Sequence, residues 1–386
     1  MSEAVSNRVR RYDLVTPMIP CRGEIMAGFE RILMSGQYIL GEEVHALERE
    51  MATACGAADA VGVDSGSSAL HVALELAGVG PGVEVITTPY TFLATVEAIV
   101  RLGGTPVLVD IRPHDLNFDP ALVEAAITPR TRVILPVHIF GAPCDMEPLL
   151  AIAARHGLDL VEDMAQAFGS FHRGRPCGSF GRMACLSFYP TKNLPAMGDA
   201  GMVFCRDAAD AAALRQLRGH EAVRIDGRLH SGWNYRIDEV QAMVIRVRLA
   251  RFLDEQRDRD RVAEIYNGLI PATHRLAAAD AARGDRVTHH QYWVRSRRRD
   301  ELQRLLAGAG IDTGLYYHPP IHRHPLGQQC RAAGPLVEAE RAGAEVLTLP
   351  IHPALPEAAA RRIGGLVGDF LRAETTAAPV SPGGRP

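Results

Sequence analysis

Lys192 stands in the segment SFYPTKNLPAMGDAGM, directly after an apolar run at 183–189. A lysine in a turn rich in glycine and proline is usually solvated and without a chemical role. A lysine held at the end of a buried strand differs, because burial lowers the pKa of its amine and leaves a neutral nucleophile that can attack an aldehyde. Nearby Ser187, Gly198 and Gly201 would let a hydroxyl and the backbone approach a phosphate closely. The segment therefore predicts a nucleophilic amine beside an anion site.

Asp163 ends the apolar run LDLVED, and Gln166 follows it three residues later. Ligands of open α/β sheets bind beyond the carboxyl ends of the strands, so this carboxylate is expected at the ligand edge. The alternative is a helix N-cap, a common role of aspartate. From these residues alone, the cap is the preferred interpretation.

A serine-rich helix start is the third chemical feature. The segment VDSGSSALHVALELAG (63–78) joins a short strand-like run to an apolar helix that begins with Gly66, Ser67 and Ser68. Free amides and the positive end of the helix dipole at such a start form an anion site. Ordinary serine capping is the commoner explanation of an isolated helix start of this kind.

The elements that must position these residues alternate along the chain. Short β-rich runs occur at 83–88, 106–110, 133–138, 158–163, 183–189 and 202–205, and several of them are almost continuously apolar, as is typical of strands covered by helices on both faces. Apolar residues recur with helical spacing between them, at 92–102, 120–127 and 146–156. This alternation predicts an α/β fold with a mainly parallel central sheet.

The length of 386 residues exceeds what one hydrophobic core usually fills, so we expect two domains. After Asn234 the pattern changes to a long charged helical stretch and then to weaker strand signals near 286–295. We predict a large domain at 1–254 that includes the N-terminal segment, a smaller α/β domain at 255–374 and a flexible tail at 375–386.

Composition excludes several classes of protein. A formal net charge of −3 provides no basic field for nucleic acid, and the arginine runs at 8–11 and 297–299 are typical of solvated faces. No apolar stretch is long enough for a signal peptide or a membrane span, so we expect a soluble cytoplasmic protein without nucleic-acid or membrane partners. The seven scattered cysteines lack the paired spacing of a metal site, so we expect no metal and reduced thiols at Cys21, Cys55, Cys144, Cys177, Cys185, Cys205 and Cys330.

Taken together, the motifs resemble the DegT/DnrJ/EryC1/StrS aminotransferases, which make amino sugars, including those of antibiotics, and related aminocyclitols. The resemblance spans almost the whole chain and rests on the ordered motifs SGQYILGEEVHALERE, SGSSALHVAL, PYTFLAT, GGTPVLVD, ITPRTRVILPVHIFG, VEDMAQAFGS, SFYPTKNL, NYRIDEVQA, PPIHRHPL and LTLPIHP. It implies the fold type I architecture of pyridoxal-phosphate-dependent transferases: a large domain with a mainly parallel sheet and a smaller C-terminal α/β domain.

The resemblance also implies the cofactor contacts of pyridoxal 5′-phosphate and its pyridoxamine form. Lys192 corresponds to the lysine that forms the Schiff base and shuttles a proton, and Asp163 to the carboxylate that keeps the pyridine nitrogen protonated. Gln166 corresponds to the contact with the ring hydroxyl, and Phe92 to the aromatic ring stacked on the cofactor, although Phe92 could also be plain core. The phosphate contacts correspond to Ser67, in place of a more usual threonine, Ser68 and Ser187.

Asn234, in the motif NYRIDE, corresponds to a residue that reaches the cofactor phosphate of the neighbouring subunit. The resemblance therefore implies a homodimer with shared active sites. The alternative for Asn234 is a loop or capping role, which is ordinary for asparagine. Arg236 could bind an anionic part of a substrate, and a structural salt bridge is an equally good explanation.

Two departures from the family pattern lie on the substrate side. The common GEGG motif after the lysine is Gly198-Asp199-Ala200-Gly201 here, a form similar to members that act on 3-keto nucleotide sugars. The usual His-Tyr-Pro pattern appears as Tyr316-Tyr317-His318, with Pro320 and His322 following. Substrate contacts are expected from Tyr189, Arg236, Tyr316, Tyr317 and His322.

The resemblance implies transfer of an amino group from an amino acid, L-glutamate as in the family, to a nucleotide-linked keto-deoxysugar. Asp199 favours the 3-keto over the 4-keto position. The alternatives are an aminocyclitol ketone as acceptor, sugar dehydration, and a regulator that binds the cofactor without turnover. Retention of Lys192 disfavours dehydration, since the dehydrating lineage carries histidine there. No DNA-binding appendage or basic face favours the regulator.

Overall fold

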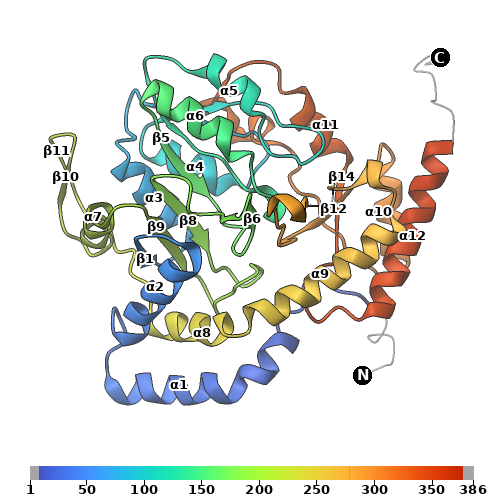
Figure 1. Cartoon of the computed structure of the whole chain (residues 1–386), viewed down its shortest axis with the longest axis horizontal. Helices are drawn as coiled ribbons and strands as arrows, with labels where there is room; N and C mark the ends of the chain where they lie inside the picture. The colour runs from blue at the N-terminus through green and yellow to red at the C-terminus, as the bar shows by residue number, and fades with distance from the viewer. Residues whose placement is uncertain (1–7, 278, 377–386) are drawn as a thin grey trace.

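A computed structural model describes residues 8–277 and 279–376 of the chain. Its centre is an eight-stranded sheet (Figure 1). In spatial order the strands are β1 (Asp59–Val63), β9 (Gly201–Cys205), β8 (Met183–Ser187), β5 (Asp159–Asp163), β4 (Thr131–Ile134), β2 (Glu84–Thr87), β3 (Thr105–Leu108) and β13 (Arg331–Ala332). Only β9 runs antiparallel to its neighbours, so the predicted α/β fold with a mainly parallel central sheet is confirmed.

Alternate side chains of the strands supply two cores, one on each face of the sheet. On one face, Val61 and Val203 pack with the helices α3 (Gly66–Leu76), α4 (Leu93–Arg101) and α7 (Ala208–Arg218). On the other face, α5 (Pro120–Ala126) and α6 (Met146–His156) cover one end, and α2 (Glu42–Cys55) and α8 (Glu239–Leu249) the other. Coverage of both faces explains why β2 and β9 are buried along their whole length.

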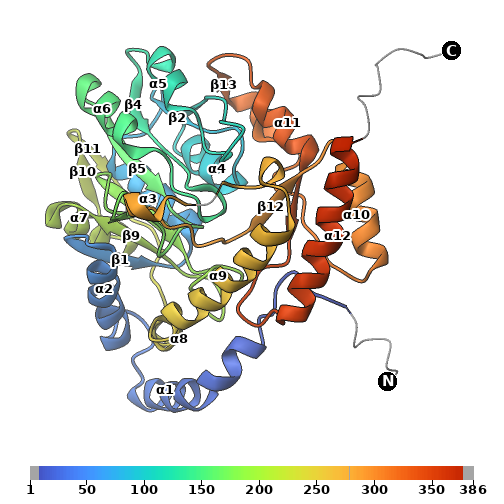
Figure 2. The same ribbon diagram turned by 45° about the vertical axis from the view of Figure 1, so that its right-hand side comes forward.

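A second group of elements packs around the antiparallel pair β12 (Tyr292–Arg295) and β14 (Val346–Leu349). The helices α9 (Phe252–Leu269), α10 (Arg299–Gly308) and α12 (Glu357–Thr376) bury their apolar faces against this pair. Figure 2 shows α9 extending from the large sheet towards α10 and α12.

The N-terminal segment and β13 both cross the predicted division at residues 254 and 255. Val9 donates its backbone N–H to the carbonyl of Gly310 at 2.8 Å, so the N-terminal segment lies on the second group. β13 returns in the other direction and pairs with β3 of the large sheet. The division therefore stays a prediction. Residues 375 and 376 end α12, and the rest of the expected tail lies outside the described residues.

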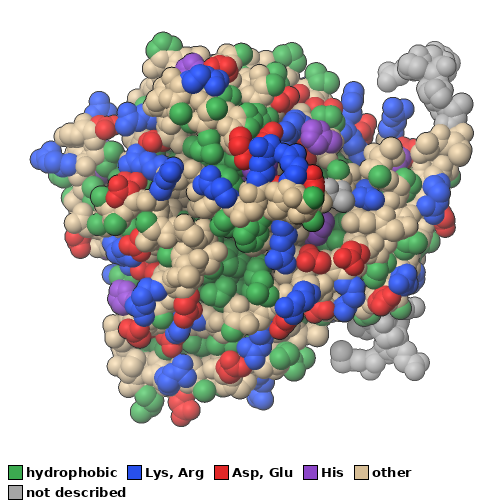
Figure 3. All heavy atoms as spheres, in the orientation of Figure 1, with side chains coloured by type: hydrophobic (Ala, Val, Ile, Leu, Met, Phe, Trp, Pro, Cys, Tyr) green, Lys and Arg blue, Asp and Glu red, His purple; other side chains and the backbone are tan. Residues whose placement is uncertain are grey.

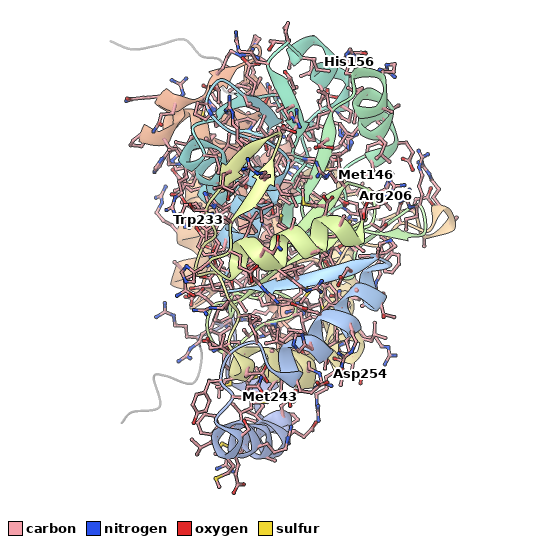
Figure 4. The ribbon with its side chains drawn as sticks, turned by 90° about the vertical axis from the view of Figure 1, so that its left-hand side faces the viewer. Met146, His156, Arg206, Trp233, Met243 and Asp254 are labelled. Atoms are coloured by element: carbon pink, nitrogen blue, oxygen red, sulfur yellow. The ribbon has the colours of Figure 1, made fainter. Side chains whose placement is uncertain are left out.

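The helix α1 (Arg22–Ser35) lies across α8 at the foot of the molecule. Its contact depends on Gly28, because a Cβ there would come within 2.6 Å of the sulfur of Met243 on α8 (Figure 4). The opposite face of α1 exposes a row of apolar side chains, Met26, Phe29, Leu33 and Met34.

The remaining elements connect these groups. They are β6 (Phe171–His172), β7 (Arg175–Pro176), β10 (Val223–Ile225), β11 (Arg228–His230) and α11 (Val337–Glu345), with the 3-10 turns η2 (Thr16–Cys21), η3 (Ile139–Gly141), η4 (Ala272–His274), η5 (Ala281–Arg283), η6 (Ile321–Arg323) and η7 (Pro325–Gln329). Acidic and basic side chains are interspersed on the face shown in Figure 3, and neither sign forms a continuous field there.

Among the described residues, no helix combines the length and apolar character needed to cross a bilayer. All seven cysteines are free thiols.

Glu162 in β5 is a fully buried carboxylate that fixes two loops below the sheet. Its Oε1 accepts hydrogen bonds from the amides of Phe180 and Gly181, and its Oε2 accepts one from Gly178, all at 2.8 Å. His138 Nδ1 accepts from a backbone amide, so the proton of a neutral ring lies on Nε2, which donates to Glu162 at 3.0 Å.

We expect Glu162→Ala to lower the free energy of unfolding by about 3 kcal/mol, because it leaves buried donors without an acceptor. Urea denaturation followed by circular dichroism measures the change. Glu124→Ala is the matched control, since Glu124 is exposed and pairs only with surface Arg155 and His156. Equal stability of the two variants would show that the loops do not depend on Glu162.

Candidate active site

A cavity of about 430 Å³ lies at the carboxyl edge of the large sheet. The parallel neighbours β5 and β8 both end there, at Asp163 and Ser187. The helix α3 begins at the same edge, with Ser67 in its first turn. Nine of the predicted site residues line this cavity: Ser67, Phe92, Asp163, Gln166, Ser187, Tyr189, Lys192, Tyr316 and Tyr317.

Lys192 lies in the loop that joins β8 to β9, and it is the only lysine in the 386-residue chain. Its backbone N–H donates to the carbonyl of Tyr189 at 2.8 Å. The next residue, Asn193, is buried and donates to the carbonyl of Thr288 at 2.9 Å, which anchors the loop. The amine reaches the cavity while the surrounding protein excludes most water, and this desolvation lowers the pKa of Lys192 to about 8. A substantial fraction of the amine is therefore neutral near physiological pH.

Asp163 is buried, with 4% of its surface exposed. Thr95 donates its hydroxyl to one carboxylate oxygen at 2.8 Å, and the amide of Ala165 donates to the other at 3.1 Å. Burial raises the pKa of Asp163, whereas these hydrogen bonds and the charge of Lys192 lower it. No arginine or lysine of the described residues forms a salt bridge with Asp163, so its charge is free to act on a cationic group in the cavity.

The start of α3 approaches the ends of β8 and β9 unusually closely. A Cβ on Gly66 would lie 2.6 Å from the Cβ of Ser187, and one on Gly201 would lie 2.2 Å from the carbonyl oxygen of Ser65. Ser65 caps α3 by accepting a hydrogen bond from the amide of Ser68 at 3.1 Å. Helix amides and serine hydroxyls thus meet around one small volume, which is the donor set that a phosphate needs.

An aromatic wall closes another side of the cavity. Tyr317 stacks on Phe140 with ring centroids 6.0 Å apart, and Phe92 lies 6.5 Å from Tyr317. Gln166 bridges this wall, because its amide nitrogen donates to the hydroxyl of Tyr317 at 2.7 Å and its oxygen accepts from the amide of Phe140 at 2.8 Å. Phe92 exposes 57% of its surface, so its ring is available to a ligand.

Tyr316, at the position of the usual family histidine, is tied to the N-terminal segment. Its hydroxyl accepts a hydrogen bond from Arg11 at 2.6 Å. Gln291 donates to the hydroxyl of Tyr12, and both residues line the cavity. The N-terminal segment therefore forms part of the site.

Four predicted residues do not line this cavity. Ser68 is buried behind Ser65, with their hydroxyl oxygens 2.9 Å apart. His322 faces away and pairs with Glu340 on α11 at 3.1 Å. Arg236 donates to the side-chain oxygen of Asn234 at 2.7 Å, outside the cavity of their own chain. The roles assigned to these residues stay predictions.

Several lining residues were not singled out from the sequence, namely Tyr12, Ser65, Thr95, His290 and Gln291. Thr95 is the last residue of the motif PYTFLAT and Ser65 directly precedes the noted Gly-Ser-Ser start, so both had a local signal. Tyr12, His290 and Gln291 had none, because folding brings them from far along the chain.

Known proteins share this sequence and fold. Residues 21–367 match the sequence profile of the DegT/DnrJ/EryC1/StrS aminotransferase family. The chain is 41% identical over 355 residues to a pleiotropic regulatory protein of Geobacillus stearothermophilus, covering 90% of this chain and 95% of that protein. It is 40% identical over 363 residues to the dTDP-3-amino-3,4,6-trideoxy-alpha-D-glucose transaminase of Streptomyces venezuelae, covering 94% and 96%. The crystal structure of S. venezuelae DesV in complex with a ketimine intermediate superposes with a TM-score of 0.87 at 41% identity, covering 94% and 98% of the two chains.

Because desolvation lowers the pKa of Lys192, we expect its amine to titrate near pH 8. The titration can be followed chemically, since only the neutral amine reacts with acylating reagents. Trace acetylation across a pH series, read by peptide mass spectrometry, isolates this amine because the chain has no other lysine. Asp163→Asn should move the midpoint to lower pH, since the carboxylate favours the protonated amine. A midpoint near the ordinary lysine value of about 10.4 would contradict the buried setting of the amine.

Proposed function

Because this chain belongs to the DegT/DnrJ/EryC1/StrS aminotransferase family, a class of pyridoxal-phosphate-dependent enzymes, we propose that it aminates a nucleotide-linked keto-deoxysugar. L-Glutamate is the proposed amino donor and the 3-keto position the favoured acceptor site. The observation that carries the proposal is the pairing of a half-buried lysine of lowered pKa with a buried carboxylate in one cavity that also holds a phosphate-type donor set.

The residues of the cavity fit the cofactor. Asp163 would face the pyridine nitrogen, and Lys192 would hold the cofactor covalently through Nζ. Ser67 and Ser187 would bind the phosphate at the start of α3, and Phe92 would cover the face of the ring. When bound, the cofactor supplies an electron sink for the carbon that carries the amino group.

Proton transfer falls to Lys192. The neutral Nζ would accept a proton from the donor carbon and later return one to the acceptor carbon. A pKa near 8 suits both steps, because such an amine binds and releases a proton readily near neutral pH. The hydroxyl of Thr95 and the amide of Ala165 hold the carboxylate of Asp163 in place, and its oxygens keep lone pairs for the pyridine nitrogen.

The preference for a 3-keto sugar has two supports. Asp199, which follows the lysine in place of the usual glutamate, lines the cavity. The S. venezuelae relative is named for a sugar that carries its amino group at carbon 3. Tyr189, Asp199 and Tyr316 are the proposed sugar contacts, because they line the cavity and Tyr189 exposes 51% of its surface.

A regulatory role is the second candidate, because the relative from G. stearothermophilus is named a pleiotropic regulatory protein. A pure sensor does not need a neutral amine to move protons, whereas the lowered pKa of Lys192, about 8, leaves part of its amine neutral near pH 7. We therefore rank turnover above sensing. An aminocyclitol ketone remains the alternative acceptor within the enzyme family.

We further propose a homodimer with shared active sites. The apolar row on α1 continues into exposed Ile19 in the turn before it, and contiguous exposed apolar residues often mark a protein–protein interface. Asn234 and Arg236 lie outside the cavity of their own chain, and Asn234 is exposed while Arg236 is half-buried. A second copy seated on α1 would cover the apolar row and receive Asn234 at its cofactor phosphate.

The function is tested by a half-reaction screen. The enzyme loaded with pyridoxamine phosphate is offered nucleotide-linked 3-keto and 4-keto sugars and a cyclitol ketone, and return of the pyridoxal-form absorbance is followed. We expect the fastest return with a 3-keto sugar and no complete turnover by Lys192→Ala, because no other lysine can replace it. Reaction with the cyclitol ketone alone would assign the acceptor differently, and reaction with none would favour sensing.

Shared sites are tested by mixing two inactive variants, Lys192→Ala and Asn234→Asp. The second places a negative charge against the cofactor phosphate, where like charges repel. A mixed dimer has one site with both defects and one with neither, so activity should return after subunit exchange.

The matched control mixes Lys192→Ala with Asp163→Asn. Both residues line the cavity of one chain, so each site of the mixed dimer keeps a defect and activity should stay low. No recovery in the first mixture, with heterodimers verified by mass, would place Asn234 in its own chain's site.

A further inference from the structure

A second cavity, of about 250 Å³, adjoins the active site. Both cavities are lined by Tyr12, Thr191, Lys192 and His290, so the lysine loop separates them. The second cavity lies between this loop, the N-terminal segment and the chain after β14, and its floor contains two arginines, Arg248 and Arg259.

The two arginines differ in their partners. Arg248 pairs with Glu255 at 2.5 Å and also donates to the carbonyl of Pro17. Arg259, on α9, forms no hydrogen bond or salt bridge with the described residues, although only 7% of its surface is exposed. Its Nη1 is enclosed without an acceptor. Such an arrangement is costly, because a buried guanidinium usually has an anion against it.

The neighbouring acids do not supply that anion. Glu255 is occupied by Arg248. Asp13, which lines the cavity, accepts from the hydroxyl of Thr16 at 2.6 Å and from two backbone amides. Asp260 accepts from Gln256 at 2.7 Å and lies 3.5 Å from Arg286. Arg259 is therefore the charged group of this cavity that has no direct partner among the described residues, and Asp13 is held by neutral donors instead of by this guanidinium.

The other titratable groups facing the cavity do not cancel this charge. Burial lowers the pKa of both His290 and His352, so both rings are neutral near pH 7. His352 presents a buried Nδ1 without a partner. Burial also lowers the pKa of Arg259, to about 10, which leaves the guanidinium charged at neutral pH. The cavity is small and contains a charged guanidinium whose Nη1 has no acceptor among the described residues, and both features favour a small anion.

We propose that Arg259 binds a carboxylate of the amino-acid donor in this cavity. The inference rests on the proposed function, in which an amino acid must present its amine beside Lys192. The cavity begins at Lys192, so a carboxylate on the same small molecule can enter it. The planar guanidinium fork matches a carboxylate, while the phosphate-type donors lie at the start of α3 in the other cavity.

Binding of glutarate to the cofactor-loaded enzyme, measured by isothermal titration calorimetry, tests the subsite, because glutarate carries carboxylates but no amine. Arg259→Gln should weaken glutarate binding at least about 30-fold, which corresponds to about 2 kcal/mol. Arg257→Gln is the matched control on the same helix, since Arg257 is exposed and pairs with Asp254. Glutaramide, the uncharged analogue, should not bind.

Arg259→Lys keeps the charge but lacks the planar fork, and it serves if the glutamine variant does not fold. It should bind glutarate more weakly than wild type. In the half-reaction with L-glutamate, both variants should raise KM more than they lower kcat. No glutarate binding to wild type, or equal binding by wild type and the Arg259 variants, would overturn the subsite.

The two proposals fail separately. If no amino acid reacts but glutarate binding depends on Arg259, the proposed function fails and the anion subsite stands. If L-glutamate reacts with unchanged KM in the Arg259 variants, the subsite fails and the aminotransferase function stands.

Discussion

Two opposite charges that share one poorly hydrated cavity, Lys192 and Asp163, set the requirements for the rest of the structure. Burial disfavours the charged form of each group, and each charge partly offsets that cost for the other. The balance holds only if both side chains reach the same edge of the sheet. The parallel pairing of β5 and β8 meets that condition, since the carboxyl ends of parallel neighbours lie together. Glu162, the neighbouring residue in β5, points to the opposite face of the strand and accepts hydrogen bonds from the amides of Gly178 and Phe180. These bonds fix the position of the strand that presents Asp163.

The anion site imposes a second constraint, on backbone spacing. Residues with a side chain at Gly66 or Gly201 would collide with Ser187 or Ser65, so the close approach of α3 to the strand ends requires glycine at both positions. The same approach brings Ser67 to the cavity. Cofactor binding therefore depends on chain geometry as much as on the functional side chains.

Local sequence patterns predicted the elements that form this edge. The six β-rich runs each overlap one strand of the large sheet, and the three helical spacings match α4, α5 and α6. The resemblance to the aminotransferase family, confirmed by the family match, directed attention to Lys192 and Asp163. Contacts between distant segments carried no such signal. Tyr12 meets Gln291 across 279 positions, and Val9 meets Gly310, because tertiary packing alone sets those pairings. The antiparallel direction of β9 was likewise invisible, since a buried strand has the same apolar pattern in either direction.

The charges on the two sides of the lysine loop explain how one amine can serve two unlike substrates in turn. The first cavity opens past exposed Phe92 and Tyr189, aromatic surfaces suited to a large ligand that stays partly outside. The second is smaller and contains Arg259, which has no partner among the residues the structure describes, and this suits a compact anion. A sugar nucleotide is too large for the second cavity, and a small amino acid would gain little from the open aromatic surface of the first. If the donor carboxylate occupies the Arg259 cavity, the two substrates are anchored in different cavities. Lys192 is then the residue that both substrates reach. Selection of each substrate then needs no change in the catalytic groups, because the discrimination lies in the two separate surroundings of one amine.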